Sequence, residues 1–152
     1  MKLYLDVSCL NRPFDDQRQA RIRLETEAVA LIFERFDAGR WRQVSSQIAE
    51  IEIAAMPDAE RRRRVRALLP PQADIIMLTP EIFARAADLE GMGFKAADAV
   101  HLAAAEAQEA DVFLSCDDRL CRLARRRRDR LTVVVANPLA WLKENEDASN
   151  AG

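Results

Sequence analysis

Residues 1–10 read MKLYLDVSCL. The hydrophobic run at 2–5 is short and leads directly to Asp6, as expected for a buried strand that ends at a carboxylate. A second run, at 112–115, leads in the same way to Asp117. In open parallel α/β sheets, ligands bind beyond the carboxyl ends of the strands. We therefore expect both acids to lie at one functional edge of a sheet.

Two further acids fit this edge. Glu52 follows an expected strand at 41–45, in a helix whose N-cap we expect at Ser45 or Ser46. Asp98 lies in the first turn of an expected helix at about 95–109. Carboxylate oxygens suit hard cations such as Mg²⁺ or Mn²⁺, which polarise phosphoryl oxygens and activate water. The four acids together predict metal-assisted chemistry on phosphodiesters.

Strand and helix patterns alternate along the whole chain. Pro13 is expected to interrupt the pattern after the first strand, and Thr79 with Pro80 is a strong helix start. The remaining expected strands are 74–78 and 131–135, and the remaining expected helices are Asp15 or Asp16 to about Asp37, 57 to about 70, 79–91, 118–128 and a short one from Pro138. This alternation predicts a parallel sheet with helices on both faces and right-handed crossovers.

Composition indicates one ordinary globular domain. The chain has 152 residues, of which 49% are hydrophobic, and no apolar stretch approaches the roughly 20 residues that span a bilayer. The N-terminus runs directly into a strand without a signal-peptide pattern, so we expect a cytoplasmic protein with no membrane partner. Cys9, Cys116 and Cys121 have no paired metal-ligand spacing and are interpreted as small buried hydrophobic residues.

Charge is balanced overall but unevenly distributed. The net charge is −2, yet residues 61–66 hold five arginines and residues 119–130 hold seven. Such clusters can contact phosphates. They can equally be solvated helix faces that form local ion pairs, and the sequence leaves both interpretations open.

Four segments together resemble the successive motifs of PIN domains, the PilT N-terminus nuclease fold: MKLYLDVSCL, SSQIAEIE, KAADAVHLAAAEA and VFLSCDDRL. The resemblance extends from Met1 to about Leu142. It implies a single PIN-like domain at 1–142, followed by a frayed C-terminal tail at 143–152. The implied fold is a three-layer α/β/α sandwich with about five parallel strands in the order 3-2-1-4-5.

The resemblance also implies a set of site residues. Catalytic roles fall on Asp6, Glu52, Asp98 and Asp117, of which Asp6, Asp98 and Asp117 chiefly hold the metal, Mg²⁺ or Mn²⁺. Ser115 stands where the family more often has threonine in Thr-x-Asp, and it keeps the hydroxyl. Glu52 lies six residues beyond Ser46, which fits the family spacing best, while Glu50 is a nearby competitor as the second acid.

The function implied is a metal-dependent ribonuclease that hydrolyses RNA, resembling VapC-like toxins. Such toxins belong to type II toxin-antitoxin pairs, so a small antitoxin protein and a homodimer are expected partners. One alternative is a PIN fold that binds RNA or protein without cutting. A phosphotransfer fold is a third, although Asp6-Val7-Ser8 lacks the second aspartate of a D-x-D phosphatase.

Several other polar or aromatic residues have two interpretations. His101 can be a packing residue or can touch substrate or a metal-bound water. Arg12 can contact a phosphate or pair with an acid of the following turn. Asp118 can support the site or cap its helix, as any one of the four acids can. Trp41 and Trp141 are expected to pack.

Overall fold

The computed structural model describes residues 1–151, with side chains described through residue 145. Its strands are β1 (Lys2–Leu5), β2 (Arg42–Ser46), β3 (Ile75–Ile76), β4 (Val112–Leu114) and β5 (Val134–Ala136). Its α-helices are α1 (Val7–Asn11), α2 (Ala20–Asp37), α3 (Gln47–Ala54), α4 (Ala59–Arg66), α5 (Pro80–Gly91), α6 (Ala96–Ala107), α7 (Asp118–Arg126) and α8 (Pro138–Ala151). Short 3₁₀ helices are η1 (Arg12–Phe14), η2 (Gln72–Asp74) and η3 (Arg128–Arg130).

All strand pairs are parallel, and the sheet order is β3-β2-β1-β4-β5. This order confirms the expected 3-2-1-4-5. The chain moves outward from β1 to β3 and then crosses back to β4 on the other side of β1. The carboxyl ends of β1 and β4 are therefore neighbours at the switch point, with Leu5 opposite Leu114.

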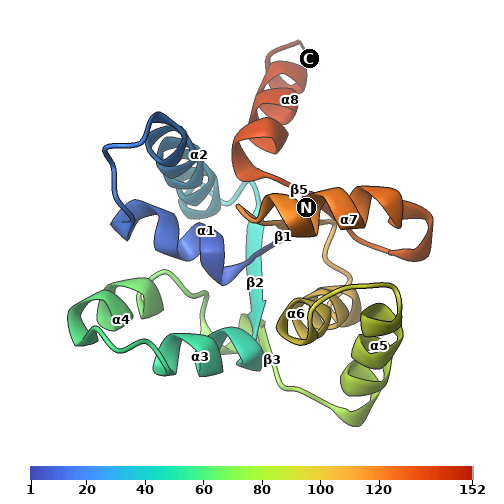
Figure 1. Cartoon of the computed structure of the whole chain (residues 1–152). Helices are drawn as coiled ribbons and strands as arrows, with labels where there is room; N and C mark the ends of the chain where they lie inside the picture. Colours follow the sequence, from blue (N-terminus) through green and yellow to red (C-terminus); the bar gives the residue numbers. More distant parts are fainter. Residues whose placement is uncertain (152) are drawn as a thin grey trace.

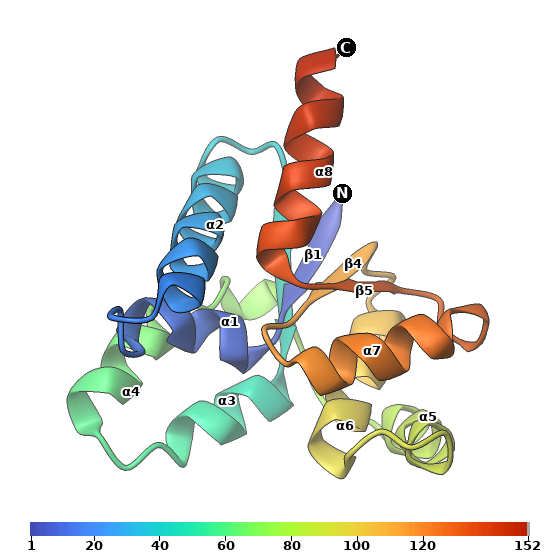
Figure 2. The ribbon, with the colours of Figure 1, turned by 45° about the horizontal axis from the view of Figure 1, so that its top comes forward.

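Alternating side chains place a core on each face of the sheet. Leu3 and Leu5 of β1 enter one core and Tyr4 enters the other, as the two-residue period of a strand requires. The first core is closed by α1, α2, α3, α4 and α8, and the second by α5, α6 and α7. Figures 1 and 2 show these two helical layers with the sheet between them. The structure confirms the three-layer α/β/α sandwich.

The start of α2 differs from the sequence-based expectation. This helix begins at Ala20 after Gln19, not after a capping Asp15 or Asp16. Asp15 instead pairs with the guanidinium groups of Arg12 and Arg61, and Asp16 pairs with that of Arg18. Those arginines engage the carboxylates that were expected to cap the helix.

The turn after β1 also differs, because α1 was not expected. This five-residue helix buries Val7, Cys9 and Leu10 against the sheet. Pro13 follows at the start of η1, where its missing N–H removes no helical hydrogen bond. The proline therefore ends a helix that the sequence pattern did not reveal.

Element lengths differ mainly at the sheet edges. β3 has two residues, not five, and β5 begins at Val134, not at 131. α8 continues through Ala151, so it is longer than the short helix expected and runs through most of the segment 143–152. Fraying of that segment stays a prediction, and Gly152 lies outside the described residues. Within residues 1–151, no helix is both long enough and apolar enough to cross a membrane.

Candidate active site at the carboxyl end of the sheet

Asp6 occupies the first position beyond β1 and is held by two hydroxyl groups. Its backbone N–H donates to Leu114 O at 2.9 Å, which extends the pairing with β4 by one residue. Its Oδ2 accepts hydrogen bonds from Ser8 Oγ at 2.9 Å and from Ser115 Oγ at 2.8 Å. The side chain is nearly buried, with 7% of its surface exposed. These bonds fix one carboxylate oxygen.

The same two hydroxyls hold the turn that carries Asp117. Ser8 Oγ accepts from Cys116 N at 3.1 Å, and Ser115 Oγ accepts from Asp117 N at 3.1 Å. Asp117 is the N-cap of α7, and its Oδ1 accepts from the backbone N–H groups of Arg119 and Leu120. The interpretation of Asp117 as a cap is therefore correct, and it leaves Oδ2 without a protein donor in the described part of the chain.

Asp98 brings a third carboxylate into the same electrostatic field. It is half-buried in the first turn of α6. Burial, followed by the charges of Asp6 and Asp117, raises the pKa of Asp98 to about 6, against the smaller opposing effects of His101 and Lys95. Asp98 and Asp117 border the same depression, and the hydroxyl of Ser115 contacts both Asp6 Oδ2 and the backbone N–H of Asp117. Three of the four predicted acids are therefore gathered at this edge of the sheet.

Glu52 reaches the site through His101. On α3, Glu52 Oε1 lies 2.8 Å from Nε2 of His101 on α6, and His101 Nδ1 lies 2.6 Å from the hydroxyl of Tyr4. That hydroxyl also shares a 2.7 Å hydrogen bond with Ser46 Oγ. Because a carboxylate only accepts, Nε2 carries the proton, and in the neutral ring Tyr4 donates to Nδ1. Glu50, on the same helix, has no polar contact among the described residues.

Electrostatics at His101 reflect these acids. Burial alone would lower the pKa of this imidazole, which is 1% exposed. The hydrogen bond to Glu52 and the negative charges of Asp6, Glu52 and Asp98 outweigh burial and raise the His101 pKa above its ordinary value. Burial raises the pKa of Tyr4 as well, so this phenol keeps its proton.

The donor chemistry of the site fits a hard divalent cation. Asp6 Oδ1, Asp117 Oδ2 and both oxygens of Asp98 receive no hydrogen bond from the described residues, and all are oxygen ligands. A cation would also relieve the repulsion that raises the Asp98 pKa. As the side chains stand, however, no three His, Cys, Asp or Glu side chains in the described part of the chain converge on one point that would hold an ion. Binding would therefore require these carboxylates to move toward one another.

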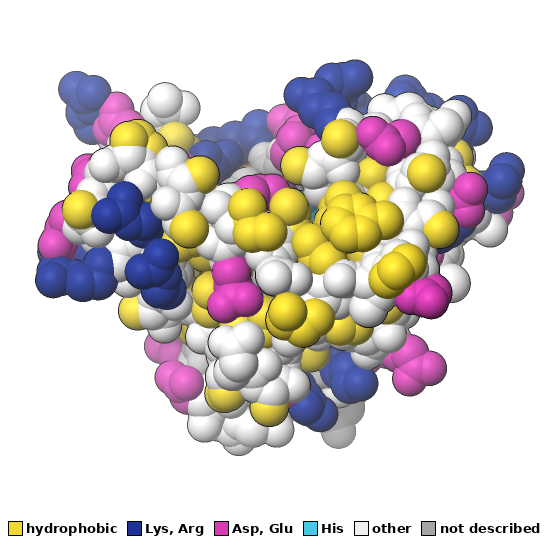
Figure 3. All heavy atoms as spheres, turned by 90° about the horizontal axis from the view of Figure 1, so that it is seen from below, with side chains coloured by type: hydrophobic (Ala, Val, Ile, Leu, Met, Phe, Trp, Pro, Cys, Tyr) yellow, Lys and Arg dark blue, Asp and Glu magenta, His cyan; other side chains and the backbone are white. Residues whose placement is uncertain are grey.

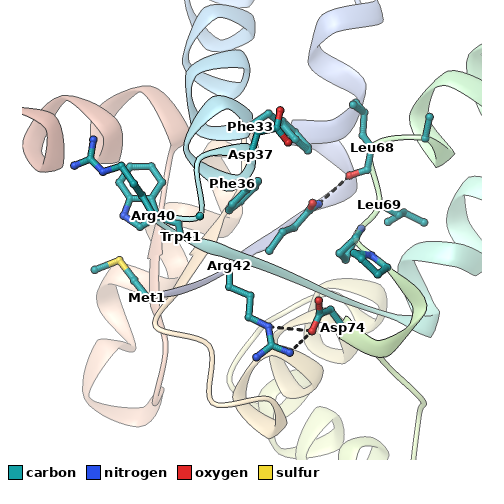
Figure 4. A pocket seen from close by; sticks show the side chains of 15 residues that line it. Met1, Phe33, Phe36, Asp37, Arg40, Trp41, Arg42, Leu68, Leu69 and Asp74 are labelled. Atoms are coloured by element: carbon teal, nitrogen blue, oxygen red, sulfur yellow. Dashed lines mark hydrogen bonds and ion pairs between the residues drawn. The ribbon is translucent and has the colours of Figure 1, made fainter.

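Cavity size does not identify this site. A pocket of about 760 Å³ lies around the amino-terminal end of β2 and is lined by Met1, Trp41 and Arg42 among others (Figure 4). Arg42 Nε donates to Asp74 Oδ1 at 3.0 Å across it. None of the four acids lines this pocket. The acids Asp98 and Asp117 instead border a shallow depression with Arg119.

Other candidates have structural roles away from the acids. Arg12 pairs with Asp15 and with the buried Glu25, so the ion-pair interpretation is correct. Asp118 neither caps α7 nor joins the acids, because it pairs with Arg21. Trp41 and Trp141 pack edge to face with ring centroids 4.9 Å apart. The three cysteines are buried free thiols, and Cys9 Sγ lies 3.8 Å from Cys116 Sγ at hydrogen-bonding distance.

Tyr4 and Ser46 are polar residues near the site that sequence reasoning missed. The alternation of β1 could have shown that Tyr4 faces away from Leu3 and Leu5. It could not have shown which partner the hydroxyl finds, since His101 is 97 positions away.

Comparisons with known proteins agree with this architecture. A structure of FitAB bound to an IR36 DNA fragment is 18% identical, with a TM-score of 0.59, covering 90% of this chain and 95% of that one. A structure of VapBC2 from Rickettsia felis, bound to a DNA fragment from its promoter, is 13% identical, with a TM-score of 0.57 and coverages of 90% and 98%. Among curated proteins, none matches. The PIN domain family model matches residues 3–126, so the chain belongs to the PIN domain family.

Proposed function

We propose that this protein is a nuclease that hydrolyses RNA phosphodiester bonds at the edge formed by Asp6, Glu52, Asp98 and Asp117. The observation that carries the proposal is the grouping of Asp6, Asp98 and Asp117 at one edge of the sheet, where burial and the charges of the other two raise the pKa of Asp98 to about 6. Membership of the PIN family, whose members are generally nucleases, supports a hydrolase. The RNA substrate rests on the resemblance to VapC-like proteins.

In this proposal, Asp6, Asp98 and Asp117 hold Mg²⁺ or Mn²⁺. Such a cation, when bound, polarises the phosphodiester and makes water a better nucleophile. The protein supplies position: Ser8 and Ser115 fix Asp6 Oδ2 and leave the other oxygen available. Glu52 is anchored through Oε1 by His101, so Oε2 is available to accept a proton from the attacking water.

The test is cleavage of labelled single-stranded RNA and structured tRNA in Mg²⁺, in Mn²⁺ and in EDTA. We expect cleavage in either metal, none in EDTA and none from Asp6→Asn. Asp118→Asn is the matched control, because it removes a nearby carboxylate that pairs with Arg21 outside the site. Cleavage by folded Asp6→Asn, or equal loss in Asp118→Asn, would contradict the assignment.

We also propose that the protein is the toxin of a toxin-antitoxin pair and acts in the cytoplasm. The names FitAB and VapBC2 each denote two components, and both structures contain a bound DNA fragment. If this chain has a comparable partner, its expression alone should arrest growth, and co-expression of a small protein from the adjacent gene should restore growth. Growth arrest that persists in Asp6→Asn would separate toxicity from nuclease activity.

A homodimer is part of the proposal. Ile51 of α3, Met77 after β3 and Phe83 of α5 are 52%, 56% and 52% exposed. Figure 3 views the molecule from the side of α3 and α5 and shows hydrophobic side chains gathered on this face. Exposed apolar patches on a soluble chain mark association surfaces. Light scattering should give twice the chain mass, and Phe83→Asp should reduce it.

One observation favours a second function. Because no three carboxylates converge on one point among the described residues, the PIN fold can also serve as a module that binds RNA without cleaving it. RNA binding by wild type that leaves every substrate intact in both metals would establish that function instead.

A further inference from the structure

The two arginine clusters of this chain differ in how their charges are used. On α4, Arg61 pairs with Asp15, Arg62 donates to Met56 O at 2.6 Å, and Arg63 and Arg64 both pair with Glu60. Four of the five arginines in that cluster therefore already have protein partners. The interpretation as a helix face with local ion pairs is correct there.

The second cluster has no such partners. We define the α7 arginine surface as Arg119, Arg122, Arg125, Arg126, Arg127, Arg128 and Arg130, all of them exposed. Within the described part of the chain, none of these side chains donates a hydrogen bond or forms an ion pair. The charge of Arg122 acts on Asp118 without a direct contact, and Asp129 lies within η3, but the seven like charges still repel one another. An unneutralised group of this kind is a site for an anionic partner.

The position of this surface relates it to the acids. α7 begins directly after Asp117, and Arg119 borders the same depression as Asp98 and Asp117. Arg122 and Arg126 follow at helical spacings of three and seven, so they share a face with Arg119. The nine residues of α7 extend about 13 Å from the site at 1.5 Å per residue, and η3 continues beyond them.

We propose that the α7 arginine surface binds the phosphodiester backbone of the RNA substrate on one side of the bond to be cut. The proposal rests on the nuclease function proposed above and adds the path that the strand takes. A polyanion is repelled by the acids of the site and by the net charge of −2, so local positive charge is needed to hold it there. Guanidinium groups suit phosphate because they bind it in a bidentate manner.

Contacts of this kind are recognised by their dependence on salt. Each phosphate contact with a single strand contributes about −0.7 to the slope of log K against log salt. Removing three contacts should reduce the magnitude of that slope by about 2. Raising the salt from about 50 to about 200 mM should then weaken binding about 18-fold more in the parent than in the variant.

The experiment measures binding without cleavage. Fluorescence anisotropy of labelled single-stranded RNA is followed across salt in EDTA, with Asp6→Asn as the parent so that the strand stays intact. The test variant adds Arg119→Gln, Arg122→Gln and Arg126→Gln. The matched control adds Arg63→Gln, Arg64→Gln and Arg66→Gln on α4, with the same change in net charge. Thermal melting checks that both variants fold.

We expect weaker binding and a smaller slope in the α7 variant only. Equal changes in the two variants would mean that net charge alone acts, and no change in either would assign the α7 arginine surface to another partner, such as an acidic protein; both outcomes overturn the proposal.

Because binding is measured without cleavage, the nuclease proposal and the proposal for the α7 arginine surface fail separately. A wild type that binds through α7 but never cuts refutes only the nuclease. A wild type that cuts while the α7 variant binds normally refutes only this surface.

Discussion

Glu52 Oε1 lies 2.8 Å from Nε2 of His101, so the only histidine of the chain holds the second acid of the site. The opposite ring nitrogen, Nδ1, is held by Tyr4 at 2.6 Å. Both contacts come from elements distant in sequence, and the imidazole between them is buried. The ring therefore has no freedom to turn, and Glu52 is fixed at one oxygen.

This contact distinguishes Glu52 from Glu50. We predict that Glu52→Gln lowers the rate of RNA cleavage by about 100-fold or more, as expected when a group that takes a proton is removed. Glu50→Gln should retain nearly full activity, because Glu50 has no polar contact in the described residues. The ratio of kcat values for the two variants is the measurement. Equal activity of the two variants would remove Glu52 from the site.

Removal of the Tyr4 hydroxyl should weaken the hold on His101 and, through it, on Glu52. Tyr4→Phe keeps the ring, which stacks on Phe113 with centroids 5.1 Å apart, and leaves the buried Nδ1 of His101 without its donor. We expect a loss of about 1–3 kcal/mol in the free energy of unfolding. If the proposed site holds a metal, activity should fall about 10- to 100-fold, because a hydrogen bond that orients His101, and through it Glu52, is lost.

The measurement for Tyr4→Phe is urea unfolding together with NMR of the imidazole ring. Since His101 is the only histidine, its ring signals need no assignment. Ring nitrogen shifts should move in Tyr4→Phe if the hydrogen bond is present. Unchanged ring shifts with unchanged activity would show that the phenol has no positioning role.

Burial of Asp98, together with repulsion from Asp6 and Asp117, predicts a pH-dependent gain of stability from Asp98→Asn. The raised pKa, about 6 instead of 3.8, means that the folded protein binds the proton more tightly than the unfolded chain. Stability of the metal-free wild type therefore falls as the pH rises from about 4 to about 6. Above pH 6, Asp98→Asn should be more stable by about 1 to 2 kcal/mol, after allowance for solvent screening of this half-buried group.

The stability advantage of Asp98→Asn over wild type should grow as the pH rises and shrink when metal is added. At pH values near 4, wild type and Asp98→Asn should unfold alike, because Asp98 is then protonated in the folded state. Addition of Mg²⁺ at neutral pH should stabilise wild type more than Asp98→Asn and close the gap. A gap that persists at low pH would point to packing as its cause.

The buried thiols should be unreactive in the folded protein. Burial, together with the charges of Asp117 and Asp118, raises the pKa of Cys121 to about 12, and burial raises that of Cys9 well above its ordinary value. Since the thiolate is the reactive form, native protein should resist iodoacetamide at pH about 8. Mass spectrometry should find three labels after unfolding and none before. Rapid labelling of the native protein would show that this core opens.

Different parts of the molecule were predictable for different reasons. Asp6 and Asp117 could be placed at strand ends because each follows a short hydrophobic run. This signal is local and can be read without knowledge of the fold. The position of β1 between β2 and β4 is not a local property, and only the resemblance to PIN domains supplied it. The structure confirms that strand order, and it is this order that makes the two acids neighbours.

The sequence-based predictions were wrong where a side chain had several possible partners. Asp15 and Asp16 are of a residue type that caps helices, but nearby guanidinium groups pair with them, and α2 begins only at Ala20. The difference between the two arginine clusters was hidden for a related reason, since Glu60 pairs with Arg64 one turn away, whereas Asp118, the acid at the start of α7, pairs with Arg21 of α2. The contact of Tyr4 with His101 joins two elements that no periodicity connects.

The shared hydroxyls of Ser8 and Ser115 have a consequence for protein synthesis. Asp6 leaves the ribosome first with Ser8, but Ser115, its second hydrogen-bond donor, and Asp117 arrive more than 100 positions later. A nascent chain shorter than about 115 residues therefore lacks the Ser115 donor to Asp6 and also lacks the fourth acid. For a chain proposed to cleave RNA, the late synthesis of β4 delays the assembly of the active site. The four acids cannot come together until most of the polypeptide has been translated from its own message.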